Sequence, residues 1–459
     1  MESSQQLSTR SSFRDLSGFL FFNDGILYRQ VNLAGKDDYD YFIGSGLYDQ
    51  LVKNNWLIKH EETGIREGAY KIIKPEVINF ISYPYEWCFG QLKDAALLTL
   101  EIQRKVLGFG MSLKDASAYN IQFKDGRPIL IDTLSFERYE EGKPWVAYKQ
   151  FCQHVLAPLA LMAYKDVRLS QLMRIYIDGI PLDLASSLLP LTTRFKFSLL
   201  SHIHLHAKTQ DYFADKPIDP GKHKISKNGF LALIDSLEAS IKAMKWKPKG
   251  TEWADYYKFT NYSDAALSEK EKIVDDMIAE AKPKTVWDFG ANTGLFSRLA
   301  SKRGIATISF DIDPAAVEKN YREARSRKEK NILPLLIDFT NPSPATGWSN
   351  EERMSLLSRG PADLAMALAL IHHLAISNNL PLDRIADFFS KVCTSLVIEF
   401  VPKSDSQVQK LLKTRKDVFP DYDQGNFEKE LSRLFEIKKK QNLSDSKRTL
   451  YLMTKRQYV

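Results

Sequence analysis

Two glycines and a downstream carboxylate are the residues of this chain whose types and spacing most clearly predict chemistry. Gly290 and Gly294 follow a short apolar run, and the residues after them have a helical pattern. Glycine lets the backbone turn sharply and approach a ligand, and the first N–H groups of a helix are unpaired donors. Asp311 ends the next apolar run, about 20 residues later, where a carboxylate can accept hydrogen bonds from ribose hydroxyls. The pattern therefore predicts a pocket for a ligand that carries a ribose.

The spacing within the glycine turn argues against NAD, because Asn292 stands where the dinucleotide fingerprint has its second glycine. Residues 288–294 instead resemble the first motif of class I S-adenosylmethionine-dependent methyltransferases, with Asp311 at the place of their ribose-binding acid. This resemblance implies that four residues of the stretch, together with Asp311, bind the cofactor. They are Asp288, Gly290, Asn292, Gly294 and Asp311.

Further apolar runs predict the next strands and two more parts of the site. The run 333–337 ends at Asp338, where methyltransferases often place a polar residue beside the adenine. The run 362–371 ends in His372 and His373, and ligands of open α/β sheets bind at the carboxyl ends of the strands. Because imidazole titrates near neutral pH, either histidine could take a proton from an oxygen or nitrogen acceptor. The alternative is that one histidine packs beneath the sheet edge and the other only shapes the pocket.

The C-terminal part of the chain completes the pattern of a Rossmann-like, seven-stranded α/β sheet. The run 395–400 precedes two strand-like runs, 434–438 and 449–453, which fit the antiparallel pair that methyltransferases add to such a sheet. In many methyltransferases an aromatic segment before the first strand folds over the cofactor as a lid. Here that segment contains Trp253, Tyr256, Tyr257 and Tyr262. Packing at a domain edge is the alternative, because aromatic side chains bury large apolar areas anywhere.

The N-terminal half carries a second signature, of an α+β domain. Asp115, Asn120 and Asp132 have the spacing of the catalytic loop in protein-kinase-like and aminoglycoside-phosphotransferase-like folds. The resemblance implies that Asp115 accepts a hydroxyl proton and that the other two hold Mg²⁺ for ATP. The run 78–83 is then the expected strand before the hinge, and 95–107 the helix before the loop.

Three departures from the kinase pattern leave the activity of this domain open. The histidine that usually precedes the catalytic loop is absent, no glycine-rich phosphate loop is visible, and Arg29 is the nearest cation to a third-strand lysine. An active phosphotransferase, nucleotide binding without catalysis, and a fold without phosphotransfer all stay open. The alternating His202, His204 and His206 would share one face of a strand, but without a neighbouring cysteine or carboxylate we expect hydrogen bonding and predict no metal site.

Length, composition and charge bound the organisation of the chain. With 459 residues and 44% apolar side chains it can bury more than one core. A helix at 230–244, which we expect to pack on the methyltransferase domain, follows a polar linker. The predicted boundaries are 1–207 for the kinase-like domain, 208–250 for the linker and connecting helix, and 251–459 for the methyltransferase domain.

The same numbers bound the partners and the location. A net charge of +7 is mild for this length, so a nucleic-acid partner is not indicated, although the lysines at 438–440 could form a basic rim. No apolar run is long enough for a membrane span, and the three cysteines form no C-x-x-C motif. We expect a soluble, cytoplasmic protein.

Five segments extend the methyltransferase resemblance over nearly the whole chain. They are 83–88, 114–120, 144–148, 370–374 and 398–403. Together they are similar to a bacterial and archaeal family of class I methyltransferases, in which some members are described as nodulation-specificity proteins and others lie near surface-polysaccharide genes. The resemblance implies S-adenosylmethionine as the cofactor and O-methylation of a glycan or another small molecule. An RNA or protein acceptor, and phosphotransfer with ATP and Mg²⁺ by the kinase-like domain, are the alternatives.

Overall fold

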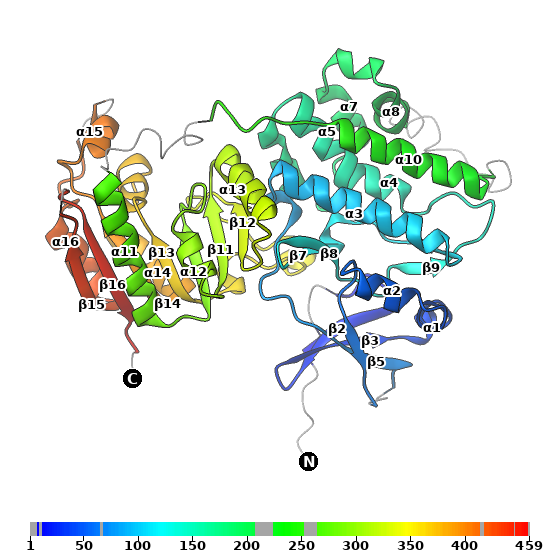
Figure 1. Ribbon diagram of the computed structural model, residues 1–459, viewed down its shortest axis with the longest axis horizontal. Coiled ribbons are helices and arrows are strands. Elements are labelled where there is room, and N and C mark those ends of the chain that lie inside the picture. The colour runs from blue at the N-terminus through cyan, green and yellow to red at the C-terminus, as the bar shows by residue number, and fades with distance from the viewer. Residues whose placement is uncertain are drawn as a thin grey trace. The chain divides into compact units, whose positions relative to one another are not determined.

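The structure, a computed structural model, has two compact units (Figure 1). It describes residues 7–8, 12–64, 68–206, 224–251, 264–413, 417–444 and 446–457. Unit 1 consists of Met1–Lys247 and Ala345–Arg353, and unit 2 of Pro248–Pro344 and Met354–Val459. Within the described ranges, no helix is both long and apolar enough to cross a lipid bilayer.

Unit 2 is built on a seven-stranded sheet in the order β12-β11-β10-β13-β14-β16-β15 (Figure 1). Five neighbouring strands are parallel: β10 (Thr285–Phe289), β11 (Ala306–Asp311), β12 (Ile332–Leu336), β13 (Ala362–Ala367) and β14 (Cys393–Phe400). The last two, β15 (Phe435–Asn442) and β16 (Thr449–Lys455), are antiparallel. This is the strand order of class I methyltransferases, so the predicted Rossmann-like sheet with a late antiparallel pair is confirmed.

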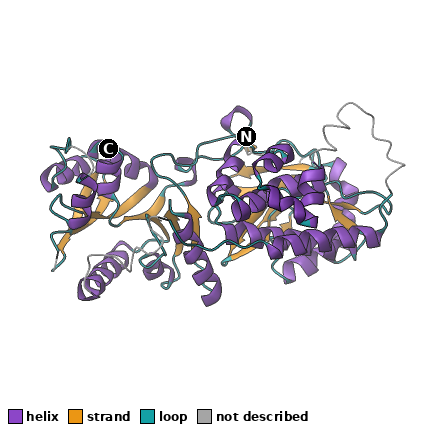
Figure 2. Cartoon of the chain, turned by 90° about the horizontal axis from the view of Figure 1, so that it is seen from above, coloured by secondary structure: helices purple, strands orange, loops and turns teal. Residues whose placement is uncertain are grey.

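Helices cover both faces of this sheet (Figure 2). They are α11 (Asp264–Ala281), α12 (Ser297–Ser301), α13 (Pro314–Arg327), α14 (Leu382–Val392), α15 (Ser406–Leu412) and α16 (Gln424–Ser432). On one face, Val274 and Met277 of α11 share a buried cluster with Val286 of β10 and Leu364 of β13. Strands buried on both faces need apolar side chains throughout, which is why their sequences read as continuous apolar runs.

Unit 1 begins with an antiparallel sheet in the order β1-β2-β3-β5-β4. Its elements are β1 (Leu7–Ser8), β2 (Gly18–Asn23), β3 (Ile26–Val31), α1 (Lys36–Gly44), α2 (Leu47–Lys53), β4 (His60–Glu62) and β5 (Lys71–Pro75). A long helix, α3 (Phe89–Leu107), and two small sheets follow. These sheets pair β6 (Met111–Leu113) with β9 (Phe136–Arg138), and β7 (Ile121–Lys124) with β8 (Arg127–Leu130). Sheet, long helix, loop and hairpin follow one another as in protein-kinase-like domains, as predicted.

Unit 1 has further helices, and one of them, α10, packs on a surface other than the one we expected. The further helices are α4 (Tyr148–Phe151), α5 (Ala157–Tyr164), α6 (Leu172–Ile175), α7 (Leu182–Leu188), α8 (Phe197–Leu199) and α10 (Lys227–Ala243). We expected α10 to pack on the methyltransferase domain, but it packs on α3. Arg104 of α3 forms ion pairs with Asp235 and Glu238 of α10, both at 2.6 Å. An amphipathic pattern shows that a helix buries one face but does not name the surface that covers it.

The predicted strand at 78–83 is wrong, since the structure has no strand there and β5 already ends at Pro75. The amide of Gln122 takes the place of a neighbouring strand. Its Oε1 accepts the N–H of Ser82 at 2.8 Å, and its Nε2 donates to the carbonyl oxygen of Ser82 at 2.8 Å. A buried side-chain amide can satisfy both backbone groups of one residue, so Ser82 needs no strand partner.

Of the alternating histidines, His202 and His204 lie in a π-helix, Leu200–Leu205, and His206 is its C-cap, so they do not lie on a strand. His202 hydrogen-bonds with the hydroxyl of Tyr148 at 2.7 Å and with that of Ser236 at 3.0 Å. His204 hydrogen-bonds with two further hydroxyl groups of the same unit. Burial lowers the pKa of His202 to about 4, so the ring is neutral and acts in packing and hydrogen bonding. In the described part of the chain, no cluster of His, Cys, Asp and Glu is arranged to hold a metal ion.

Ala345–Arg353 belongs to unit 1, although its flanks in the sequence belong to unit 2. Glu352 is buried and accepts hydrogen bonds from Arg14, with 2.5 Å between Arg14 Nε and Glu352 Oε1. The guanidinium of Arg353 lies 4.3 Å from the ring centre of Tyr119, a residue of the predicted catalytic loop. No sequence pattern indicated that Ala345–Arg353 packs with unit 1, because this packing depends on contacts with residues more than 200 positions away.

Candidate active site

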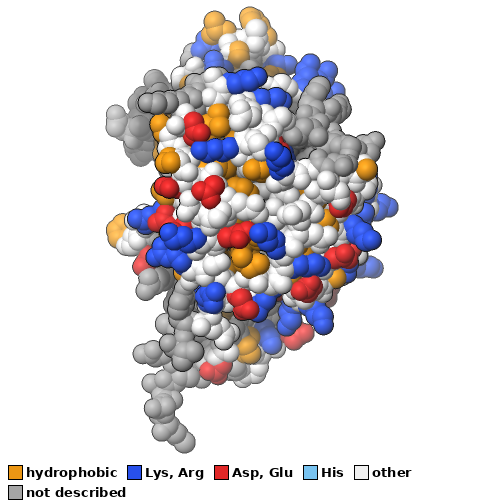
Figure 3. All heavy atoms as spheres, turned by 90° about the vertical axis from the view of Figure 1, so that its left-hand side faces the viewer, with side chains coloured by type: hydrophobic (Ala, Val, Ile, Leu, Met, Phe, Trp, Pro, Cys, Tyr) orange, Lys and Arg blue, Asp and Glu red, His pale blue; other side chains and the backbone are white. Residues whose placement is uncertain are grey.

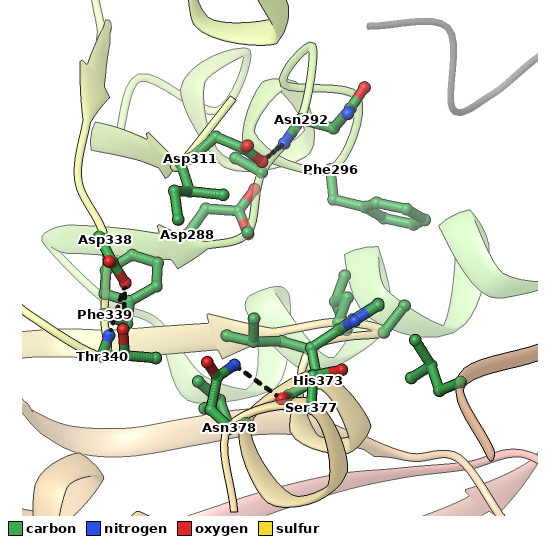
Figure 4. Close-up of a pocket in the computed structure, with 18 of the residues that line it drawn as sticks. Asp288, Asn292, Phe296, Asp311, Asp338, Phe339, Thr340, His373, Ser377 and Asn378 are labelled. Carbon is green, nitrogen blue, oxygen red and sulfur yellow. Dashed lines mark hydrogen bonds between the residues drawn. The ribbon is translucent and has the colours of Figure 1, made fainter. Parts of the chain in front are cut away.

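The carboxyl ends of four parallel strands meet at one edge of the sheet in unit 2, and a cavity of about 300 Å³ opens there (Figure 4). The register pairs Phe289 with Phe310 and Asp311 with Leu336, so β10, β11 and β12 end side by side. Open α/β sheets bind ligands at this edge. Six of the predicted site residues line the cavity: Asp288, Gly290, Asn292, Asp311, Asp338 and His373. Gly294 and His372 lie behind the lining.

The glycine turn closes tightly against β11 and α13. The N–H groups of Gly290 and Ala291 both donate to the carbonyl oxygen of Phe310 at 2.9 Å. Gly294 has φ +80°, and a Cβ there would lie 2.6 Å from the side chain of Asn320 on α13. Gly294 is thus required by packing behind the loop, whereas Gly290, with φ +77°, lines the cavity itself. Gly294 does not line the cavity, and its part in cofactor binding stays a prediction.

Asp311 is held rigidly at the end of β11. Its Oδ2 accepts the N–H of Asn292 at 2.7 Å (Figure 4). Its Oδ1 accepts the N–H of Asp313 at 2.8 Å. Burial raises the pKa of Asp311 to about 6 in spite of these hydrogen bonds. Each carboxylate oxygen has a second lone-pair site. The side chain can therefore accept ribose hydroxyls without any rearrangement.

Asp288 lies beside Asp311 at the end of β10 (Figure 4). Its Oδ2 accepts a hydrogen bond from Ser297 Oγ at 2.6 Å. Burial and the charge of Asp311 raise the pKa of Asp288 to about 7, while the hydrogen bond from Ser297 and the charge of Lys270 act in the opposite direction. Two buried carboxyl groups so close together favour a positively charged ligand, because a cation offsets their mutual repulsion. An α-ammonium group has this charge.

Asp338 follows β12 at the far side of the cavity. Its Oδ1 accepts the N–H of Thr340 at 2.8 Å and the hydroxyl of Thr340 at 2.7 Å, which closes a turn (Figure 4). Between them, Phe339 lines the cavity, and its ring lies 4.7 Å from that of Phe289. An aromatic ring beside a hydrogen-bond acceptor suits a purine that carries an amino group.

The two histidines have different surroundings. β13 ends at Ala367 and not at residue 371 as expected, because the backbone turns at Ala369, which has φ +51°. His373 lines the cavity, whereas His372 is only 2% exposed and its Nδ1 has no hydrogen-bond partner in the described structure. Burial lowers the pKa of His373 to about 4 and that of His372 well below its usual range. Both imidazoles are neutral at pH 7, and of the two only His373 can reach a bound molecule.

The kinase-like triad comes together in unit 1. The side chain of Asn120 hydrogen-bonds Asp115, whose pKa is raised by burial and, more weakly, by the charge of Asp132. Asp132 also forms an ion pair with Arg29 on β3, with 2.7 Å between Arg29 Nη2 and Asp132 Oδ1. From the sequence, Arg29 was named only as the nearest cation, and this ion pair was not predicted.

The comparison with known sequences decides the family. No protein-family model matches the chain. The nodulation protein NoeA of Rhizobium meliloti strain 1021 is 35% identical to it over 453 residues, which cover 96% of this chain and 94% of NoeA. The chain belongs to the NoeA family. The match covers both units of this chain.

Solved structures similar to this NoeA-family chain include three methyltransferases with low scores. Magnesium protoporphyrin IX methyltransferase ChlM from Synechocystis PCC 6803 is 14% identical, covers 44% of this chain and 93% of its own, and has a TM-score of 0.32. The bifunctional kinase-methyltransferase WbdD is 18% identical, with 43% and 41% covered and a TM-score of 0.29. The N-methyltransferase NodS from Bradyrhizobium japonicum WM9 is 12% identical, with 42% and 99% covered and a TM-score of 0.30. The fold assignment rests instead on the strand order of the chain itself.

Unit 2 of this NoeA-family protein is an S-adenosylmethionine-dependent methyltransferase domain. The strand order, the glycine turn and the two buried acids at the ends of β10 and β11 identify it. The cavity fits the cofactor, since it offers carboxylates to an ammonium group and a ribose and an aromatic ring to an adenine. The individual roles of the site residues stay predictions.

Sequence reasoning missed one charged residue of the cavity, Lys270 on α11. The helix contains charged residues along its length, and none of them was assigned to the site from the sequence. The available signal was spacing, because Ile273, Val274 and Met277 lie three, four and seven positions after Lys270 and are all buried. Residues at that spacing share one face of a helix. The aromatic cluster predicted as a lid, Trp253 to Tyr262, lies outside the described residues.

Proposed function

We propose that the protein transfers the methyl group of S-adenosylmethionine to an oxygen of a glycan or another small hydroxyl-bearing acceptor. The observation that carries this proposal is the neutral imidazole of His373 in the wall of the cavity. A neutral imidazole can accept the proton of a hydroxyl group. The kinship with a nodulation protein, NoeA, supports a glycan acceptor.

The order of the strands across the sheet suggests which part of the cofactor, or the acceptor, each polar residue of the cavity would contact. Asp338 lies beyond β12, Asp311 and Asp288 end β11 and β10, and His373 follows β13. Asp338 would then lie beside the adenine, Asp311 would bind the ribose, and Asp288 the ammonium group of the methionine part. The cofactor supplies a methyl group on a positively charged sulfur. The protein has to align an acceptor oxygen with it, and His373 would remove the proton of that oxygen.

Ser377 and Asn378 supply polar groups next to His373 in the same cavity (Figure 4). Both come from the π-helix His373–Ser377 and the turn after it, and Asn378 Nδ2 donates to the carbonyl oxygen of His373 at 2.9 Å. This hydrogen bond holds the turn in place. A hydroxyl and an amide at this position suit an uncharged acceptor with several hydroxyl groups, as in a sugar.

The basic run does not favour RNA as the acceptor. Lys438 pairs with Glu436 at 2.7 Å, Lys440 pairs with Glu428 at 2.6 Å, and Lys439 has a carboxylate within 3.7 Å. Figure 3 shows Lys and Arg side chains interspersed with Asp and Glu on one face of the molecule. Lysines that are already paired with carboxylates contribute little to binding a polyanion.

We infer that the kinase-like unit positions a substrate or a partner and transfers no phosphate. The ion pair between Arg29 and Asp132 supports this inference, because it competes with Mg²⁺ for the carboxylate. We also propose a cytoplasmic location. Its support is that the three cysteines, Cys88, Cys152 and Cys393, are buried free thiols.

The test incubates the purified protein with methyl-labelled S-adenosylmethionine and a cell extract that is separated into glycolipid, small-molecule, RNA and protein fractions. We expect label in the glycolipid or small-molecule fraction with the unchanged protein and none with Asp311→Ala. Label in RNA or protein would overturn the proposed acceptor. No label in any fraction, together with no binding of S-adenosylhomocysteine, would overturn the proposed reaction.

A further inference from the structure

Lys270 is a buried lysine in the wall of the methyltransferase cavity. It comes from the second turn of α11, and its side chain is only 2% exposed. Its Nζ lies 5.0 Å from the ring centre of Phe296, another residue of the lining. Burying an ammonium group costs several kcal/mol unless charged partners compensate for the lost water. The chain therefore needs a structural reason to keep this charge here.

The compensation comes from a buried series of alternating charges. Lys270 Nζ lies 2.7 Å from Oε2 of Glu399, which is 0% exposed. The same oxygen accepts the N–H of Ala369 at 2.7 Å. Arg448 Nη1 lies 3.6 Å from the other oxygen of Glu399, and Arg448 also pairs with Asp405 at 2.7 Å. The series holds two cations and two carboxylates, and Lys270, Arg448 and the N–H of Ala369 share Glu399. Burial lowers the pKa of Lys270, whereas the charge of Glu399 and its hydrogen bond favour the ammonium form.

Replacing such a series by apolar side chains would in general cost little or even stabilise a protein. Stability alone therefore does not explain the ammonium group in the wall. Lys270 and Asp288 line the same cavity, and Glu399 pairs with Lys270. The charges of Lys270 and Asp288 also act on each other's pKa. Lys270 thus belongs to the part of the cavity where the methionine end of the cofactor meets Asp288.

The charges of the lining match that end of the molecule. It carries an ammonium group and a carboxylate on one carbon atom, so a site for it needs a carboxylate and a cationic side chain a few ångströms apart. Asp288 supplies the carboxylate. Among the described residues that line the cavity, Lys270 is the one Lys or Arg side chain. We propose that Lys270 binds the carboxylate of the methionine part of the cofactor, an inference that rests on the proposed function.

The experiment measures binding by calorimetry and needs no acceptor. Two ligands are compared: S-adenosylhomocysteine, and its decarboxylated analogue, which keeps the amino group, the ribose and the adenine. A hydrogen-bonded ion pair of this kind contributes about 10- to 100-fold to affinity. We expect the unchanged protein to prefer S-adenosylhomocysteine by about that factor, and Lys270→Met to bind both ligands with equal affinity. The ratio within one variant stays meaningful even if the substitution weakens the whole pocket.

Two controls separate the outcomes. Lys272→Met removes an exposed lysine of the same helix and should keep the preference of the unchanged protein. Lys270→Arg keeps a cation and should keep part of that preference.

If Lys270→Met still prefers the carboxylated ligand as strongly as the unchanged protein does, Lys270 acts elsewhere, for example on the acceptor, and the inference is overturned. If the unchanged protein binds S-adenosylhomocysteine without any preference over the analogue, the inference fails while the proposed function stands. If it does not bind S-adenosylhomocysteine at all, the proposed function is overturned and the inference with it.

Discussion

Buried Arg29 and partly buried Asp132 form an ion pair in the kinase-like unit, with 2.7 Å between Arg29 Nη2 and Asp132 Oδ1. The guanidinium therefore pairs with the carboxylate that the kinase resemblance assigned to Mg²⁺. A tight turn at Asp24 and Gly25 joins β2 to β3, so an acidic residue stands where a phosphate-binding loop would present backbone N–H groups. Both features oppose the binding of a metal-bound nucleotide.

We predict that ATP with Mg²⁺ does not raise the melting temperature of the protein. The measurement is a thermal shift with millimolar ATP and Mg²⁺, with S-adenosylhomocysteine as the positive control for unit 2. A shift that disappears in Asp132→Ala would contradict the prediction and show a working nucleotide site. A shift that is equal in both proteins would come from elsewhere in the chain.

Asp288→Asn should stabilise the empty protein at pH 8 and remove ligand binding. Burial raises the pKa of Asp288 to about 7, above the value in an unfolded chain, so its contribution to stability is complete below pH ~4 and is lost as the pH rises through about 7. At pH 8 the native carboxylate is ionised at a cost that Asn avoids. We expect a gain of about 1–3 kcal/mol, or roughly 2–4 °C in melting temperature for each kcal/mol.

The pH dependence of this gain is the decisive part of the measurement. At pH 5 the carboxyl group of Asp288 is protonated in the folded protein but still mostly ionised in the unfolded chain, so the gain should be smaller there and disappear only below about pH 4. Asp363→Asn is the matched control, since Asp363 accepts the N–H groups of Lys284 and Thr285 at the opposite end of the sheet. That variant should show no gain at either pH. Equal melting temperatures of Asp288→Asn and the unchanged protein at pH 8 would contradict the prediction.

The parts of the site that the sequence predicted are those that depend on local patterns. The glycine turn and Asp311 are found because a strand, a turn and a helix N-terminus follow one another within a short segment. The parallel strands were visible because strands buried on both faces are apolar throughout. These features need only the order of residues along the chain.

The parts that sequence reasoning missed depend on residues far apart in the sequence. Lys270 meets Glu399 over 129 positions, and Gln122 replaces a strand partner for Ser82 over 40. The surface that covers α10 is another such case, since an apolar face fits any complementary surface. The sequence also could not show that His373 and not His372 lines the cavity, because neighbouring residues at a strand end can point into the cavity or away from it.

Gly294→Ala should destabilise the protein more than Gly290→Ala. Both residues have positive φ, which costs an alanine about 1–2 kcal/mol. A Cβ at position 294 would in addition lie 2.6 Å from Asn320, whereas at position 290 the nearest atom is in the side chain of Leu370 at 3.4 Å. Urea denaturation of both variants measures the difference. We expect a further loss of about 1–3 kcal/mol for Gly294→Ala, and equal losses would show that the turn moves freely away from α13.

His373→Gln should slow methyl transfer, and His372→Gln should not. His373 lines the cavity and its neutral ring can accept a proton, whereas His372 is buried behind the lining. With the acceptor fraction that takes up label, we expect His373→Gln to lower kcat about 100-fold or more and to leave the affinity for S-adenosylhomocysteine unchanged. His372→Gln keeps a polar side chain of similar size and serves as the control.

Because burial lowers the pKa of His373 to about 4, the rate of methyl transfer by the unchanged protein should stay level as the pH falls to about 5 and drop only below that. Full turnover in both variants would exclude base catalysis by either histidine, and the acceptor would then have to lose its proton to water after the methyl group has been transferred.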